Sequence, residues 1–221
     1  MNLNQIVQTI SIWILPVLFA VTLHEAAHGY AAKRLGDTTA QMLGRLSINP
    51  LRHIDPIGTV LVPVTLLLLH TGFLFGWAKP VPVNFNNLRH PRRDMALVAA
   101  AGPGANLLMA LAWAIVMKLG LWLAASGSSF AVPLAMMGQA GIAINLILMI
   151  LNLLPIPPLD GGRVLSGLVS PTWADRLDRV EPYGLIILVV LLVSGALGWI
   201  LGPIYGWFNA LVHSVFGLQG F

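Results

Sequence analysis

The sequence predicts an all-α polytopic membrane protein with about five to six transmembrane helices and a short cytoplasmic-side β or re-entrant region. Hydrophobic residues make up 57% of the 221 residues and charged residues only 9%, whereas an ordinary soluble domain carries about 25% charged residues. Several apolar runs reach roughly 18 residues, which is long enough to cross about 30 Å of hydrocarbon. The basic residues gather in the polar stretches between these runs, as they do in cytoplasmic loops of membrane proteins.

The first apolar run extends from about Ile6 to Leu35 and is predicted to be a membrane-spanning helix. Lys33 and Arg34 lie at its end, where basic side chains suit both a helix C-terminus and a cytoplasmic boundary. In the polar stretch that follows, apolar and polar residues alternate over 45–49. This alternation predicts a short strand.

The second apolar run, 57–75, has two possible arrangements. Basic residues precede it and follow it, which would put both of its ends on one side of the membrane, as in a re-entrant or interfacial hairpin. A full membrane span is the alternative, and the sequence leaves both open. The next segment, 77–84 (WAKPVPVN), is predicted to be extended because Pro80 and Pro82 disfavour a helix.

The remainder of the chain contains four further apolar runs that are predicted to be helical. They cover about 94–123, 131–154, 182–197 and 199–216. With this predicted topology, eleven of the twelve Lys and Arg residues lie on one side of the membrane and Lys118 alone lies near the other. We therefore expect an external N-terminus and a cytoplasmic set of loops.

Three ionisable residues interrupt the cytoplasmic half of the first run, in the sequence HEAAH from His24 to His28. Ionisable groups are costly in a membrane segment and usually mark a functional site. On a helix, His24 and His28 lie on one face, so that both imidazoles can bind one metal ion. Glu25 lies beside that face, where a carboxylate can act as a base toward a water molecule. The pattern predicts half of a metal site.

Asp160 is the predicted third ligand. Among the acidic residues, only Glu25 and Asp160 are embedded in or adjoin apolar segments away from the charged loops, and catalytic zinc typically takes three protein ligands. Asp160 follows a helix that descends toward the same side as the end of the first run. The prolines at 155–158 predict unwound backbone before it, which is tolerated at membrane depth where it lines a cavity.

The motifs resemble those of the site-2 protease family of intramembrane zinc metalloproteases. HEAAH at 24–28 and NLLPIPPLDGGR at 152–163 are similar to the paired signatures of the family. GPGAN at 102–106 and WAKPVPVN at 77–84 look like the accompanying motifs of its compact prokaryotic members. The given chain carries neither the PDZ nor the CBS domain that many relatives use for regulation.

The resemblance implies a role for each matching residue. It implies that His24, His28 and Asp160 bind zinc and that Glu25 activates water. It also implies that Asn152 contacts the substrate backbone or stabilises the oxyanion. The alternative for Asn152 is that it satisfies backbone groups near the end of a helix.

Two other polar residues are candidates for the site. Asn106 is predicted to form an interhelical hydrogen bond rather than to act in catalysis. His53, which has Asp55 nearby, is predicted to be a loop residue outside the site.

The expected function is that of an intramembrane zinc endopeptidase acting on transmembrane or membrane-proximal segments of other proteins. The expected organisation is one membrane-embedded domain over 1–221, with a catalytic core at about 6–165 and additional helices at about 182–217. A multi-pass location in a prokaryotic cell membrane is expected, with the active site toward the cytoplasm.

The sequence pI near 10.0 is attributed to the loop charges and not to nucleic-acid binding. A non-proteolytic metal-binding membrane protein or transporter is the alternative.

Overall fold

The computed structural model describes residues 3–62, 65, 76 and 78–218. Most of the second apolar run, 57–75, therefore lies outside the described residues, and the choice between a full span and re-entry falls there. Of this run, residues 57–62 and 65 are described, and Pro56–Leu61 forms a short π-helix, η2. The side chain of Asp55 accepts hydrogen bonds from the first backbone amides of η2, those of Ile57 and Gly58.

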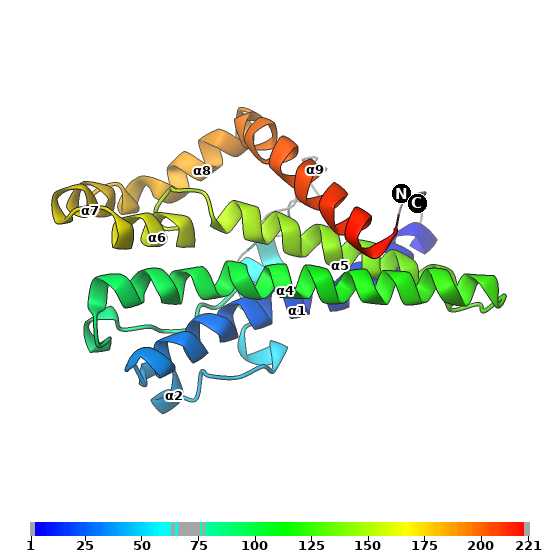
Figure 1. Ribbon diagram of the computed structural model, residues 1–221, viewed down its shortest axis with the longest axis horizontal. Helices are drawn as coiled ribbons and strands as arrows, with labels where there is room; N and C mark the ends of the chain where they lie inside the picture. Colours follow the sequence, from blue (N-terminus) through cyan, green and yellow to red (C-terminus); the bar gives the residue numbers. More distant parts are fainter. Residues whose placement is uncertain (1–2, 63–64, 66–75, 77, 219–221) are drawn as a thin grey trace.

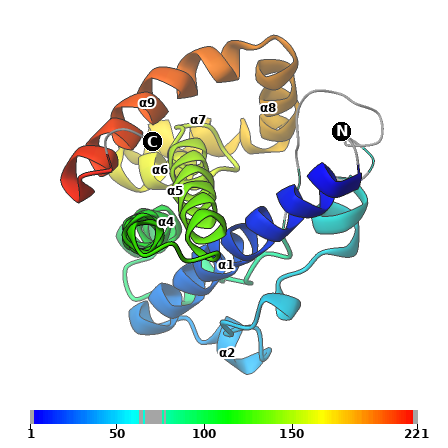
Figure 2. The same ribbon diagram turned by 90° about the vertical axis from the view of Figure 1, so that its right-hand side faces the viewer.

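Three long helices form the framework (Figures 1 and 2). They are α1 (Leu3–Leu35), α4 (Pro91–Ala125) and α5 (Ala131–Asn152), and each is long and apolar enough to cross a membrane. Helix α4 packs along both α1 and α5, and α1 also touches α5. This packing buries Thr22 and His24 of α1, whereas Gln8 and Thr9 near its start are exposed.

The contact between α4 and α5 is close because glycines lie in it. A Cβ atom at Gly138 of α5 would lie 2.5 Å from the backbone nitrogen of Met117 in α4, and one at Gly141 would fall 2.1 Å from the Trp113 ring. Small residues allow membrane helices to approach in this way. A buried cluster next to this contact includes Ile142 and Leu146, which are fully buried.

The C-terminal part consists of shorter elements that bend back over the framework. These are α6 (Asp160–Leu168), α7 (Pro171–Asp178), η4 (Glu181–Tyr183), α8 (Gly184–Val193) and α9 (Ala196–Phe216). Helix α6 packs against α4, and α9 packs against α5. The segments Pro171–Val193 and Ala196–Phe216 meet at a bend of 81°, and they arch over α5 in Figure 1.

The number of membrane spans is lower than the predicted five to six within the described part of the chain. Three helices qualify by length and composition, or four if the bent C-terminal pair forms one span. The possible span at 57–75 lies mostly outside the described residues. Among the described residues the difference arises at the C-terminus, where the two predicted helices at about 182–197 and 199–216 are α8, of ten residues, and α9. Helix α8 alone is too short to cross about 30 Å of hydrocarbon.

The predicted strand at 45–49 is not seen, because no residue of the described ranges is in a regular strand. Residues 78–84, which we call the extended segment, form neither a helix nor a regular strand, and Asn84 has extended backbone angles. This segment is held by single hydrogen bonds instead. The amide of Lys79 donates to the carbonyl of His53, and the Arg45 guanidinium donates to the carbonyls of Lys79 and Pro80.

Asp37, just after α1, fixes the other end of this extended segment. It is 1% exposed and accepts hydrogen bonds from the amide of Asn84, the side chain of Asn87 and Thr39. Burial of the carboxyl group raises its pKa, but these hydrogen bonds outweigh burial and hold the pKa of Asp37 below its usual value. Asp37 therefore anchors residues 84–87 to the end of α1 as an ionised carboxylate. Two short elements complete this region, namely α2 (Thr39–Met42) and η1 (Pro50–Arg52), and η3 (Phe85–Asn87) ends the extended segment.

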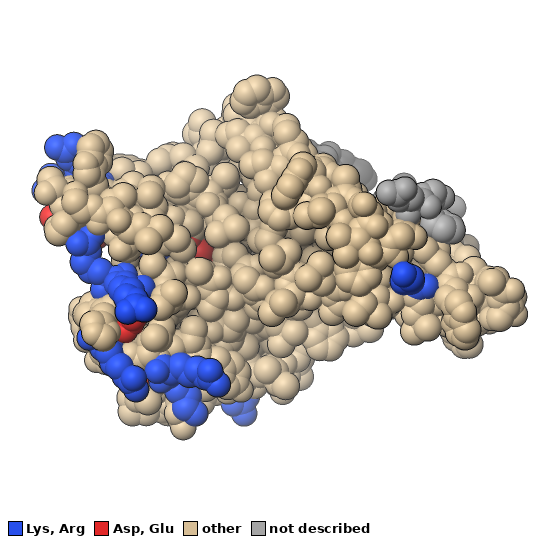
Figure 3. Space-filling model, viewed as in Figure 1, with Lys and Arg blue, Asp and Glu red and all other residues tan. Residues whose placement is uncertain are grey.

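Basic side chains gather at one end of the molecule. Figure 3 shows them at the end where α4 begins and where α2 and α7 lie, whereas most of the remaining visible face carries no charge. Lys118 is different because it belongs to the last two turns of α4, toward the opposite end. A long apolar body with charges at one end is the arrangement of a membrane protein.

Candidate metal centre

Three side chains that are distant in the sequence converge at the middle of α1. The Nε2 atoms of His24 and His28 are 3.1 Å apart, and each is 3.3 Å from Oδ2 of Asp160. His24 is buried, and the other two are largely shielded. The structure thus brings together the three residues that the sequence predicted as metal ligands, from α1 and from the first residue of α6.

The spacing of these atoms fits a zinc ion. Ligand atoms that lie 2.0–2.1 Å from zinc at tetrahedral angles are about 3.3 Å from one another, close to the 3.1 and 3.3 Å found here. Oδ2 of Asp160 is also buried without a hydrogen-bond donor among the described residues. A buried carboxylate oxygen needs a partner, and a cation bound between the three atoms would provide one.

Asp160 reaches α1 because the chain breaks after α5. Residues 153–159 contain three prolines and form turns instead of a helix, as predicted from their sequence. Helix α6 then begins at Asp160, so that this carboxylate lies in its first turn, where the helix dipole favours negative charge. A Cβ atom at Gly161 would lie 2.3 Å from the carbonyl oxygens of Leu153 and Leu154, so only glycine allows α6 to pack this closely on the turn.

The second nitrogen of each imidazole is held by α4. Nδ1 of His28 is 2.8 Å from the carbonyl oxygen of Val98, and Nδ1 of His24 is 2.6 Å from Oδ1 of Asn106. A carbonyl can only accept, so the Nδ1 of His28 carries the proton and its Nε2 lone pair faces Asp160 and His24. Such outer contacts orient the ligands of metal sites. Asn106 also donates to the carbonyl of Ala20 in α1, so the interhelical hydrogen bond predicted for it is present.

Gly102 is a site residue that sequence reasoning did not identify. A Cβ atom there would lie 2.4 Å from Nε2 of His28 and 2.6 Å from Cε1 of His24. Its lack of a side chain therefore makes room for both imidazoles. The sequence signal for it is the motif GPGAN, whose resemblance to a family motif implied no particular role for Gly102.

Gly102→Ala should weaken zinc binding without unfolding the protein. The added methyl group must displace one or both imidazoles, and a displaced ligand loses the spacing that zinc requires. We expect the zinc dissociation constant to rise by about 10-fold or more, as for loss of groups that orient ligands. Competition with a fluorescent chelator measures this constant.

Gly104→Ala is the matched control in the same helix. No heavy atom lies within 4 Å of a Cβ atom at this position, so zinc affinity should stay at the wild-type value. Equal affinities for the two alanine variants would contradict the role assigned to Gly102.

Glu25 lies beside the three converging atoms and does not belong to them. Its Oε2 accepts a hydrogen bond of 2.7 Å from the amide of Val81, in the extended segment. Val81 itself is buried, and its side chain lies against Gly29. The carboxylate is therefore fixed at one oxygen, and its other oxygen makes no hydrogen bond with the described residues.

Neither Asn152 nor His53 makes a hydrogen bond with the three converging residues. Asn152 is the last residue of α5, and its side chain donates to the carbonyl of Leu148 in the same helix. His53 is buried and its Nε2 lies 2.7 Å from the carbonyl oxygen of Ser47. His53 thus braces the loop before the extended segment, consistent with its predicted place outside the site. For Asn152, the observed contact is that of a residue at a helix end.

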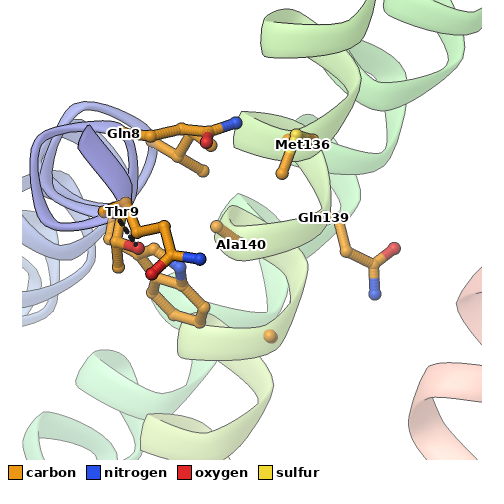
Figure 4. A pocket seen from close by; sticks show the side chains of 9 residues that line it. Gln8, Thr9, Met136, Gln139 and Ala140 are labelled. Carbon is orange, nitrogen blue, oxygen red and sulfur yellow. Dashed lines mark hydrogen bonds between the residues drawn. The ribbon is translucent and has the colours of Figure 1, made fainter. Parts of the chain in front are cut away.

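A cavity of about 630 Å³ lies apart from the cluster, between α1 and α5 (Figure 4). Gln8 and Thr9 line it from α1, and Met136, Gln139 and Ala140 line it from α5. None of these residues belongs to the converging set. The cavity is therefore not part of the metal centre.

The sequence of the chain is similar to those of known peptidases. The model of the family "Peptidase family M50" matches residues 119–195, a stretch that includes Asp160 but not the histidines. A Bacillus subtilis protein named "Putative zinc metalloprotease YwhC" is 36% identical over 191 residues, which are 86% of this chain and 84% of the relative. Rip2 of Mycolicibacterium smegmatis, whose name carries the same designation, is 32% identical over 92% of this chain and 72% of its own length. No solved structure matches.

Proposed function

The chain belongs to peptidase family M50, the site-2 protease family, and is a membrane zinc metalloprotease; from this premise we propose that it cuts peptide bonds within or next to transmembrane segments of other proteins. The main support for this proposal is that residues of the site lie within a helix that can cross the membrane. His24, Glu25 and His28 lie within α1, a helix apolar enough to cross a membrane. A substrate bond must therefore come to the membrane-embedded part of the protein.

We assign a role to each residue of the site. His24, His28 and Asp160 hold zinc through the three atoms that converge. Bound zinc would supply Lewis acidity, which lowers the pKa of a water molecule and polarises a carbonyl oxygen. Glu25 takes the proton from the attacking water at the carboxylate oxygen that Val81 leaves free, and it passes the proton to the leaving amine. Asn152 remains the proposed contact to the substrate backbone or the oxyanion.

The fixed position of Glu25 supports its role as the base. The Val81 amide holds one oxygen at 2.7 Å, so the side chain cannot rotate freely. Three protein ligands are already available to zinc without it. A carboxylate that is held next to a metal centre but is not needed as a ligand can serve in proton transfer.

The extended segment is the proposed place for an unwound substrate. A helical substrate hides its peptide bonds, so it must open locally, and an extended chain can pair with an exposed backbone. The amide of Val81 is occupied by Glu25. The amide of Val83 makes no hydrogen bond with the described residues, and the Val83 side chain packs near Ala32 and Leu88. Val83 therefore offers its backbone edge while its side chain anchors the segment.

Val83→Pro should slow cleavage without removing zinc. Proline lacks the amide hydrogen that a paired substrate strand would use, so the expected change is about a 10-fold lower kcat/KM, on the order of one lost hydrogen bond. Val83→Ala keeps the amide and trims the side chain, and it should keep most of the activity. Unchanged cleavage by the proline variant would exclude pairing at this residue.

The substrate class is tested with the purified protein in liposomes. The probe is a reporter with one transmembrane segment, and mass spectrometry locates the cut. Cleavage within or next to that segment supports the proposal, whereas cleavage confined to a soluble loop would contradict it. The same preparation shows on which side of the bilayer the products are released. A product terminus inside the liposome is protected from added protease, whereas one outside is digested. We expect release to the side of the basic loops, the cytoplasm of a prokaryotic cell.

The alternative is a metal transporter, and the distribution of ionisable groups argues against it. A transport pathway needs such groups across the membrane. Within the described ranges, His24, His28 and Asp160 form the one cluster of metal-binding side chains. On the face that Figure 3 shows, most charged side chains instead lie at one end of the molecule.

A further inference from the structure

Two buried asparagines connect the metal centre to the interior of the helix framework. Asn106 of α4 and Asn145 of α5 are both 0% exposed. Nδ2 of Asn106 donates to Oδ1 of Asn145 at 2.9 Å and to the carbonyl of Ala20 at 3.2 Å. Nδ2 of Asn145 donates to the carbonyl of Gly141 at 2.9 Å. The chain of contacts thus begins at a backbone carbonyl of α5 and ends at His24.

The direction of every hydrogen bond in this chain is fixed by groups that can only accept. The carbonyl of Gly141 requires the NH₂ group of Asn145, so Oδ1 of Asn145 must face Asn106. Asn106 then meets two acceptors, Oδ1 of Asn145 and the carbonyl of Ala20, and turns its own NH₂ group toward them. Its Oδ1 is left for Nδ1 of His24, 2.6 Å away.

We propose that Asn145 is a positioning residue for the metal centre, which acts through Asn106 to keep the proton of His24 on Nδ1. An Nδ1 that faces an acceptor holds the hydrogen, and the lone pair of a neutral imidazole is then on Nε2. Nε2 is the atom that lies 3.3 Å from Asp160. Asn145 makes no contact with the converging atoms itself. The inference rests on the proposed metal role of His24.

Both histidines therefore carry the proton on Nδ1, but each faces a different kind of hydrogen-bond acceptor. His28 meets the carbonyl of Val98 directly, and a backbone carbonyl cannot rotate to become a donor. His24 meets a side-chain amide, which could turn over and present its NH₂ group instead. Asn145 and Ala20 prevent that turn from opposite helices. The tautomer of His24 consequently depends on Asn145, a residue that does not contact it.

The test compares Asn145→Leu with the wild type in the zinc-free protein. Nitrogen chemical shifts of ¹⁵N-labelled histidine distinguish the two neutral tautomers without metal or substrate. We expect His24 in the wild type to carry its proton on Nδ1, and the leucine variant to show a mixture of tautomers. The zinc dissociation constant should rise by about 10-fold in the variant, as for other residues that support ligands.

Two further variants separate positioning from general damage. Asn145→Asp should restore the wild-type pattern, because burial keeps the carboxyl group neutral, with an oxygen for Asn106 and an O–H for Gly141. Gln139→Leu removes an amide from the same helix, at the cavity of Figure 4, and should change neither readout. An unchanged His24 tautomer in Asn145→Leu, or an aspartate variant as disturbed as the leucine variant, would overturn the proposal. Because the tautomer is read without zinc and without proteolysis, this failure is distinct from failure of the proposed function.

Discussion

Glu25→Gln should bind zinc as tightly as the wild type and lose cleavage of a transmembrane reporter by about 10²–10⁴-fold, the usual contribution of general acid–base catalysis. Glutamine keeps an oxygen that can accept the hydrogen bond from Val81, so the local structure should persist. It has no basic oxygen that can take a proton from water. The three converging atoms come from His24, His28 and Asp160, and they are unaffected by the change.

The measurement has two parts, zinc content of the purified variant and the rate of reporter cleavage. Glu181→Gln is the matched control, because Glu181 is an exposed carboxylate paired with Arg163 at the protein surface. It should keep both zinc and activity. A Glu25→Gln protein that retains zinc and cleaves at the wild-type rate would show that another group acts as the base. Loss of zinc from this variant would instead place Glu25 among the ligands.

The three candidate ligands were predictable from the sequence because each depends on local rules. His24 and His28 lie four residues apart in an apolar run, and helical periodicity alone puts them on one face. Asp160 follows three prolines that cannot continue a helix. The acidic residue after such a break is therefore free to point away from α5. These inferences needed no knowledge of how the helices pack.

The groups that surround the candidate ligands could not be predicted in the same way. The contact of Asn106 with His24 depends on how α4 lies against α1, and the contact between Asn145 and Asn106 depends on α5 as well. Gly102 acquires its role only where two imidazoles approach it. Tertiary packing decides each of these contacts. Asn152 differs, because its observed hydrogen bond is local, to the carbonyl of Leu148 in the same helix, and its contact with the substrate stays a prediction.

The helices that follow from the length of an apolar run were predicted well. The places where a helix is interrupted were predicted less well. Helices α1, α4 and α5 follow from apolar runs that are long enough to span a membrane. At the C-terminus, Ser194 and Gly195 divide the apolar sequence, and Gly195 takes a positive φ of 76°. This turn produces the bend of 81° between the two segments, which hydropathy alone does not reveal. The short alternation at 45–49 formed no strand because the described residues offer it no partner.

Asp160→Asn should lose both zinc and activity, in contrast to Glu25→Gln. The amide keeps the shape of the carboxylate but brings no negative charge to the two imidazoles, each 3.3 Å from Oδ2. Removal of a ligand should cost more than the 10–100-fold that is typical of residues that only orient ligands. A 100-fold weaker zinc affinity would also reduce the stabilisation of the folded protein by saturating zinc by about 2.7 kcal/mol. Chelator competition measures the affinity, and thermal unfolding with and without zinc measures the stabilisation.

Asp175→Asn provides the control, because Asp175 is exposed on α7 and remote from the ligand set. It should match the wild type in zinc affinity and in the zinc-dependent rise of the melting temperature. The pair of aspartate variants thus separates the loss of a ligand from the loss of any carboxylate on this side of the protein. Wild-type zinc affinity in Asp160→Asn would remove Asp160 from the ligand set, and the convergence of its Oδ2 with the two Nε2 atoms would then require another cause. Loss of zinc from Asp160→Asn together with its retention in Glu25→Gln would divide the site into ligands and base, as the geometry indicates.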